Sequence, residues 1–203
     1  MSSSVISEME HMVPELSYYK DKNIFSPAEI EAIIKKRKNF EQILSVRPRL
    51  SIFLLYIEYE VLLERIYLKR AKDVKNKRNY ITKRIDSLYC RAQFSCLGVE
   101  ELFISHLEYF LSVNNKEKIK EISLSIPKKC TGSLEVWLRC AFALRSIGEV
   151  EGSRILLQRS LRVLSHEKNR IIEEYIKLEE ENEESDSSRI IEVLRKEIGV
   201  ECK

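Results

Sequence analysis

The chain has 203 residues, of which 44% are hydrophobic and 33% are charged, a composition typical of a folded, helix-rich protein. Only five glycines and four prolines interrupt it, which argues against an all-β fold because such folds need frequent turn residues. The N-terminus lacks the basic flank and apolar core of a secretory signal, and no window is long and apolar enough to span a bilayer. We therefore expect an intracellular all-α protein without membrane contact.

Two helices are expected before residue 49. The first has an apolar seam at alternating steps of four and three residues, and Pro14 should kink or shorten it. The seam consists of Val5, Met9, Met12, Leu16 and Tyr19. The second helix should begin at a capping box, in which the Ser26 hydroxyl accepts from the Glu29 amide while the Glu29 carboxylate bonds back. Pro48 should end this helix.

From residue 50 onward a short pattern recurs, and its anchor residues are Phe53, Phe103, Trp137 and Ile172. The last three anchors lie 34 and 35 residues apart, and self-similarity at this period is the signature of stacked helix hairpins. We predict an α-solenoid of about four hairpins. The domains are then residues 1–48, an N-terminal helical docking element, and residues 49–203, the solenoid.

The second helix of each hairpin is expected at residues 82–96, 116–126, 149–164 and 187–198. The breaks between helices should fall at Gly98, Pro127, Gly132 and Gly148. Aromatic residues at helical spacing within the repeats are interpreted as core, with stacking on nucleic-acid bases as the alternative. These residues are Phe53, Tyr56, Tyr59, Phe103, Tyr109, Trp137, Phe142 and Tyr175.

The formal net charge of +3 conceals an asymmetry. Residues 65–84 contain nine basic residues against one acid, whereas residues 173–186 contain eight acids against one lysine. The basic segment is a candidate for contact with RNA phosphates, and a merely solvated or protein-facing segment is the alternative. The candidate RNA-contact residues are Lys69, Arg70, Lys72, Lys75, Lys77, Arg78, Lys83 and Arg84.

The sequence contains no pattern that indicates catalysis. It has no glycine-rich phosphate loop, its three histidines are far apart, and its five cysteines include no Cys-x-x-Cys pair. Paired carboxylates such as Glu58 and Glu60 are expected beside solvent-facing residues rather than in a pocket. We therefore predict a protein that is not an enzyme and has no catalytic residue, metal, cofactor or small-molecule substrate.

Several N-terminal motifs occur in an order that is known from one protein family. They are Val13-Pro14-Glu15-Leu16, the helix start Ile24-Phe25-Ser26, the run Ile33-Ile34-Lys35-Lys36, and Tyr56-x-x-Tyr59-Glu60. With them, the chain resembles the half-a-TPR (HAT) repeat protein of the UtpB subcomplex of the small-subunit processome, which is associated with the U3 small nucleolar RNA. The resemblance covers about residues 8 to 180. Family members are typically longer, so this chain is expected to be a short form.

The resemblance implies a non-enzymatic scaffold for pre-rRNA processing and small ribosomal subunit biogenesis in the nucleolus. It implies other UtpB subunits, including WD-repeat proteins, as partners, with pre-rRNA and U3 small nucleolar RNA as further contacts. A TPR-like peptide-binding adaptor and a HAT scaffold of another RNA-processing complex are the alternatives.

We interpret the N-terminal helices as the element that docks to another protein, because they carry an apolar surface without repeat character. The predicted protein-binding residues are Leu16, Tyr19, Phe25, Ile30, Ile33, Ile34 and Phe40. In the competing interpretation, both helices fold back and cap the first repeat.

Overall fold

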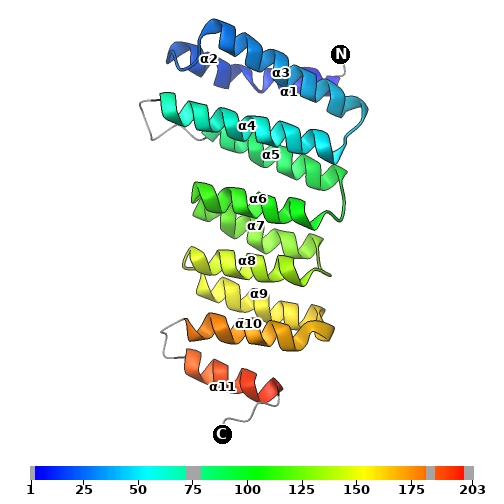
Figure 1. Ribbon diagram of the computed structural model, residues 1–203, viewed down its shortest axis with the longest axis vertical. Coiled ribbons are helices and arrows are strands. Elements are labelled where there is room, and N and C mark those ends of the chain that lie inside the picture. Colours follow the sequence, from blue (N-terminus) through cyan, green and yellow to red (C-terminus); the bar gives the residue numbers. More distant parts are fainter. Residues whose placement is uncertain (1–2, 72–78, 182–185, 199–203) are drawn as a thin grey trace. The chain divides into compact units, whose positions relative to one another are not determined.

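The computed structural model describes residues 3–71, 79–181 and 186–198, and within these residues it contains helices and no β-strand (Figure 1). The predicted all-α class is confirmed. The chain forms two compact units, Met1–Val99 and Glu100–Lys203. The first unit contains both the N-terminal helices and the first predicted hairpin. Within the described residues, no helix is long and apolar enough to cross a membrane.

The first unit begins with more helices than expected. Its elements are α1 (Ser3–Glu10), α2 (Val13–Asp21), α3 (Pro27–Val46), α4 (Leu50–Arg70) and α5 (Asn79–Ser95). Pro14 lies in the first turn of α2. Because proline has no amide hydrogen, it fits the first turn of a helix but interrupts a helix interior. The expected single helix before residue 22 is therefore two helices, and three helices precede residue 49.

The start and end of α3 were both predicted correctly. The Ser26 hydroxyl accepts from the Glu29 amide at 3.3 Å, and the Ser26 amide donates to the Glu29 carboxylate at 2.8 Å. The helix ends at Val46, two residues before Pro48. In the first unit α3 packs on α1, α2 and α4, and α4 packs along α5.

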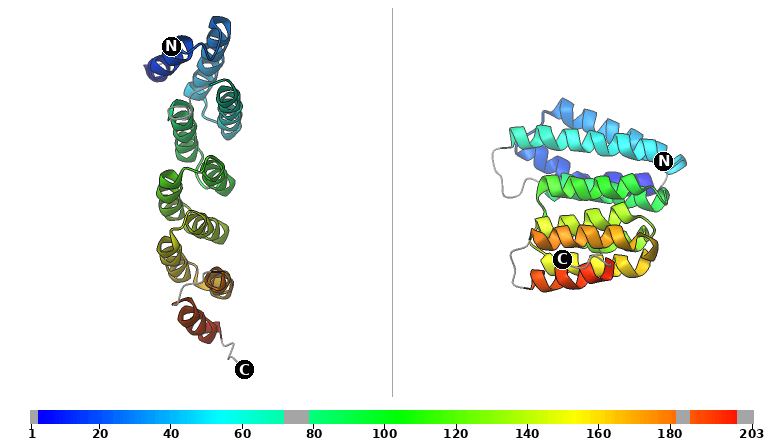
Figure 2. Two further views of the ribbon diagram at one scale, coloured as in Figure 1. Left: turned by 90° about the vertical axis from the view of Figure 1, so that its left-hand side faces the viewer. Right: turned by 60° about the horizontal axis from the view of Figure 1, so that its bottom comes forward.

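The second unit is a series of antiparallel helices (Figure 1). They are α6 (Glu100–Val113), α7 (Lys116–Lys129), α8 (Leu134–Ser146), α9 (Val150–Val163), α10 (Lys168–Glu180) and α11 (Ser187–Ile198), with a 3-10 turn at Ser165–Glu167. Consecutive helices contact each other, and α8 also contacts α6 and α10. Within this unit α6, α8 and α10 form one layer and α7, α9 and α11 form the other (Figure 2).

The predicted bounds of these helices agree with the structure except at Pro127. The break expected there is wrong, because α7 continues to Lys129 with Pro127 inside it. Proline cannot donate to the carbonyl one turn earlier, but only two residues of α7 follow Pro127, so this bond is lost near the end of the helix and the helix is not interrupted. By contrast, Gly98 and Gly148 have positive φ angles of 78° and 88°, as expected of residues that terminate helices.

The four anchor residues form the core of their helices. Phe53, Phe103, Trp137 and Ile172 are between 0% and 5% exposed. The indole N–H of Trp137 donates to the carbonyl of Thr131 at 3.1 Å, so its one polar group is satisfied. The prediction for Phe142 is wrong, because 59% of this residue is exposed. It lies five residues after Trp137, which turns it well away from the face buried by Ala141 and Leu144.

Candidate functional site

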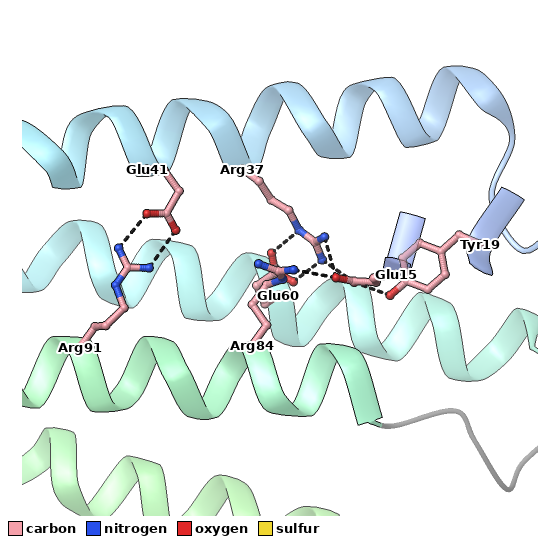
Figure 3. Close-up of polar contacts among 7 residues, drawn as sticks. All are labelled: Glu15, Tyr19, Arg37, Glu41, Glu60, Arg84 and Arg91. Atoms are coloured by element: carbon pink, nitrogen blue, oxygen red, sulfur yellow. Dashed lines mark hydrogen bonds and ion pairs between the residues drawn. The ribbon is translucent and has the colours of Figure 1, made fainter. Parts of the chain in front are cut away.

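A buried ionic cluster joins helices of the first unit around the side chain of Arg37 (Figure 3). Arg37 lies on the buried face of α3. Its Nε and one terminal nitrogen donate to the two carboxylate oxygens of Glu60 on α4, at 2.7 and 2.8 Å. Its two terminal nitrogens donate to Glu15 on α2, at 3.1 and 2.9 Å. One guanidinium group therefore bridges carboxylates from two other helices.

Two further groups bind the Glu15 carboxylate. Arg84 on α5 donates to it at 2.8 Å, and the hydroxyl of Tyr19 donates to it at 2.6 Å. The side chains of Arg37, Glu15 and Glu60 are at most 1% exposed, and that of Arg84 is 11% exposed. Two guanidinium groups thus face two carboxylates, and this matching of charge limits the cost of removing them from water.

The pKa values of the cluster follow from this pairing. Burial by itself would raise the pKa of the Glu15 carboxyl, but the guanidinium groups of Arg37 and Arg84 outweigh it and hold this pKa below its usual range. Burial would lower the pKa of Arg37, but Glu60 and Glu15 raise it well above its usual range. For Tyr19, burial and the neighbouring Glu15 carboxylate both raise the pKa of the phenol. At neutral pH the cluster therefore contains ionised Glu15, charged Arg37 and protonated Tyr19.

A second ion pair lies along the same side of α3. Arg91 on α5 donates to both oxygens of Glu41 at 3.0 and 2.7 Å, and Glu8 of α1 lies 4.0 Å from the same guanidinium group. The hydrogen bonds to Glu41 raise the pKa of Arg91. Because Glu41 follows Arg37 by one turn of α3, the two ion pairs together attach α3 to both helices of the following hairpin.

A cleft of about 360 Å³ lies beside these ion pairs, and His11 and Lys83 are among its lining residues. General acid–base catalysis needs a side chain, most often a histidine or a carboxylate, that can exchange its proton with a bound substrate. The carboxylates of Glu15 and Glu41 are instead held in hydrogen bonds to arginine. These two carboxylates are therefore suited to holding helices together.

The predicted protein-binding residues fall into two groups. Tyr19, Phe25, Ile33 and Phe40 are core residues with exposures of 1%, 5%, 4% and 7%. The ring of Tyr19 lies 5.1 Å from that of Phe25, and the ring of Phe40 stacks on Tyr56 of α4 at 4.7 Å. The first unit itself covers these four side chains, so in this arrangement they are not accessible to a partner. The other three, Leu16, Ile30 and Ile34, are partly exposed.

The candidate RNA-contact residues are also divided. Lys69 and Lys83 are exposed, whereas Lys72, Lys75, Lys77 and Arg78 lie outside the described residues. Arg70 is exposed but forms an ion pair with Glu29 at 2.9 Å. Arg84 belongs to the buried cluster, where its guanidinium group binds Glu15. We therefore correct the assignment of Arg84, because a side chain bonded inside the unit is not available to a phosphate.

Sequence reasoning missed the cluster because it assigned charged residues to the surface. Glu60 was expected beside solvent, but it is 0% exposed. The spacing of these charged residues from buried apolar residues does indicate the cluster. Glu60 lies four residues after Tyr56, and Arg37 lies four residues after Ile33, so both occupy positions that helical periodicity assigns to the buried face. A charged residue at an apolar position of a helix is the pattern that predicts a buried ion pair.

The second unit contains an ion pair of the same kind. Arg154 on α9 donates through Nε and a terminal nitrogen to the two oxygens of Glu179 on α10, at 2.8 and 2.9 Å. The hydroxyl of Ser187 on α11 donates to the same carboxylate at 2.9 Å. Burial would raise the pKa of Glu179, but the hydrogen bonds from Arg154 and Ser187 outweigh it and lower this pKa. This pair links three consecutive helices.

Comparison with known proteins gives concordant matches. A family model described as U3 small nucleolar RNA-associated protein 6 matches residues 9–92, a range that contains Glu15, Arg37, Glu60 and Arg84. The curated protein of that name from Schizosaccharomyces pombe is 32% identical over 188 residues, which cover 88% of this chain and 38% of that protein.

Two mammalian relatives are more distant. The U3 small nucleolar RNA-associated protein 6 homologs of Mus musculus and Homo sapiens are 26% and 25% identical over 187 residues, which cover 88% of this chain and 31% of each relative. The chain thus spans about a third of the length of the relatives it matches. By these matches, residues 9–92 are similar to the U3 small nucleolar RNA-associated protein 6 family, and similarity to its curated members extends over 88% of the chain.

Proposed function

We propose that this chain is a non-enzymatic scaffold of the small-subunit processome, where it supports pre-rRNA processing and small ribosomal subunit biogenesis in the nucleolus. The observation that carries this proposal is the family match, which extends over 9–92 and therefore over most of the first unit. The relatives are named for association with U3 small nucleolar RNA. We transfer this association to the present chain as part of the proposal.

The finer part of the proposal is that the chain is a HAT-repeat α-solenoid of the UtpB subcomplex. The alternation of α6, α8 and α10 with α7, α9 and α11 supports a solenoid arrangement within the second unit. The proposed partners are other UtpB subunits, including WD-repeat proteins, together with pre-rRNA and U3 small nucleolar RNA. The internally matched charges around Arg37 support a structural role for the first unit, because they fix helices rather than face a substrate.

The experiment is purification of the tagged 203-residue chain from cells, followed by quantification of U3 small nucleolar RNA against a box C/D small nucleolar RNA that guides methylation. We expect strong enrichment of U3 RNA alone, and accumulation of unprocessed small-subunit precursor rRNA when the protein is depleted. Equal recovery of both RNAs, or normal processing after depletion, would contradict the proposed function. Co-purification of WD-repeat subunits tests the UtpB assignment separately.

A further inference from the structure

Helix α4 is apolar on two sides, and only one of them is buried. Its inner side includes Phe53 and Tyr56, which are 2% and 0% exposed. On its outer side Leu55, Leu62 and Ile66 are 53%, 48% and 43% exposed. α5 packs along this helix and lies behind it in Figure 1. A helix that is apolar all round is normally covered on all sides, so the outer side of α4 has the composition of an interface.

The outer residues follow a regular spacing. Together with the partly exposed Ile52 and Tyr59, they form a stripe at steps of three, four, three and four residues, which we name the outer stripe: Ile52, Leu55, Tyr59, Leu62 and Ile66. This is the average period of 3.5 residues at which two helices pack side by side, with side chains of one fitting between those of the other. The outer stripe is about 21 Å long at 1.5 Å per residue, which is enough for about four turns of a second helix.

The charges around the outer stripe indicate the chemistry of that second helix. Arg65 and Lys69 are exposed on α4, and Glu58 is the exposed acid among them. On α3, the ammonium group of Lys36 lies 5.2 Å from the centre of the Phe40 ring, which itself lies 6.0 Å from the Tyr59 ring. Apart from the ion pair of Arg70 with Glu29, which adds no net charge, three cations and one carboxylate border the outer stripe. A binding helix with acidic residues beside its apolar face would complement them.

The same charges disfavour two other occupants. A second copy of this chain would bring the same cations against Arg65 and Lys69, and like charges across an interface are repulsive. A nucleic acid would satisfy the cations, but it offers no aliphatic side chains for Leu55, Leu62 and Ile66. The combination of an apolar stripe with a basic border fits an acidic amphipathic helix better than either.

We propose that the outer stripe of α4 binds an amphipathic helix of a partner protein, with acidic residues flanking the apolar face of that helix. This inference goes beyond the scaffold role, because it assigns a binding surface and the chemical class of its ligand. Its test needs neither U3 RNA nor any processome subunit. A failed test of this binding surface can therefore be distinguished from a failure of the proposed scaffold role.

The test measures binding of synthetic helical peptides to the full 203-residue chain by fluorescence anisotropy. The probe is a peptide of about 18 residues with leucine at its a and d positions and glutamate at e and g. A matched peptide has lysine at e and g. We expect the acidic peptide to bind at least about tenfold more tightly than the basic one. The substitution Leu62→Glu should weaken its binding about tenfold or more, because it places a charge in the centre of the interface.

Two variants make the result specific. Arg65→Glu combined with Lys69→Glu should reverse the preference so that the basic peptide binds more tightly. Val163→Glu, at an exposed position of α9 in the second unit, is the control and should leave binding unchanged. Circular dichroism checks that each variant is folded. Equal binding of both peptides, no binding, or binding that survives Leu62→Glu would overturn the proposal.

A second experiment places a photo-crosslinking benzoylphenylalanine at position 62 in the chain expressed in cells. A crosslink to a protein segment with apolar residues at steps of three and four and acidic flanks would support the proposal. A crosslink to RNA, to a second copy or to another segment of this chain would overturn it, as would the absence of any crosslink.

Discussion

Glu60 and Glu179 occupy the same position in the repeat. Each lies seven residues after its anchor residue, and each accepts two hydrogen bonds from an arginine on the helix that precedes it in the chain. Arg37 binds Glu60 through Nε and a terminal nitrogen at 2.7 and 2.8 Å. Arg154 binds Glu179 through the same atoms at 2.8 and 2.9 Å. The two units therefore use one bidentate geometry to fasten consecutive helices.

The corresponding residues of the other two hairpins are apolar. Phe110 and Leu144 lie seven residues after their anchors and are 1% and 0% exposed. The position is thus buried in all four hairpins, and in two of them it carries a charge. Because a buried carboxylate without a partner is very unfavourable, the arginine is required wherever glutamate stands at this position.

The first prediction concerns the central arginine. Arg37→Met should destabilise the first unit by about 3–5 kcal/mol, because it leaves the buried carboxylates Glu15 and Glu60 facing each other without their shared cation. Hydrogen exchange of the α3 and α4 amides in urea would measure this loss. Lys35→Met on the exposed side of the same helix is the matched control and should change stability by less than about 0.5 kcal/mol. Similar values for both variants would contradict the proposed importance of the cluster.

The second prediction concerns acid. The folded-state pKa of Glu15 lies below its ordinary value of 4.5, so the unfolded chain takes up this proton first as the pH falls. The stability contributed by Glu15 is therefore complete above about pH 4.5 and is lost as the pH falls through the lower folded-state pKa. We expect the urea midpoint of the first unit to fall steeply below pH 4.5. Glu15→Gln should lower the midpoint at pH 7 and flatten this acid dependence, and a variant with the unchanged slope would contradict the assignment.

Much of the fold could be predicted because the helical spacing of apolar residues indicates which positions are buried. The anchors Phe53 and Trp137 recur at the repeat period, and the Ser26 capping box fixes the start of α3 through local hydrogen bonds alone. The buried cluster could not be predicted from residue type, since glutamate and arginine are usually exposed. Its members come from α2, α3, α4 and α5, and no local pattern specifies which carboxylate meets which guanidinium group. The prediction that Phe142 is buried was wrong because it relied on the aromatic residue type. The position of Phe142 around the helix indicates exposure instead.

The third prediction compares two aromatic residues of α8. Trp137→Ala should lower the stability of the second unit by about 3–5 kcal/mol, because it removes a side chain that is only 5% exposed and leaves a cavity. Phe142→Ala removes a ring that is 59% exposed and should cost less than about 1 kcal/mol. Thermal unfolding followed by circular dichroism would measure both. If Phe142→Ala were the more damaging change, that ring would be packed inside the unit, which would contradict its exposed position.

The final prediction concerns the basic segment, residues 65–84. The structure excludes one of its candidate RNA-contact residues. Lys69 and Lys83 are exposed, whereas Arg84 is bonded to Glu15 and is removed from the candidates. If the segment contacts phosphates, each lost contact should reduce the slope of log affinity against log salt by about 0.7 on a single strand, and by about 0.9 on a duplex with the charge density of B-DNA. The double variant Lys69→Ser with Lys83→Ser should therefore flatten the salt dependence, and replacing Lys72, Lys75, Lys77 and Arg78 with serine should flatten it further.

The control variant removes the same amount of positive charge from a different part of the chain. Lys128→Ser with Lys129→Ser removes two exposed cations from the second unit and should leave the slope unchanged if RNA is bound through the basic segment. Filter binding of U3 RNA at several salt concentrations would measure each slope. Equal flattening in both double variants would indicate attraction by overall charge, because only direct phosphate contacts make the slope depend on which lysines are removed. An unchanged slope in every variant would show that residues 65–84 are only a solvated surface.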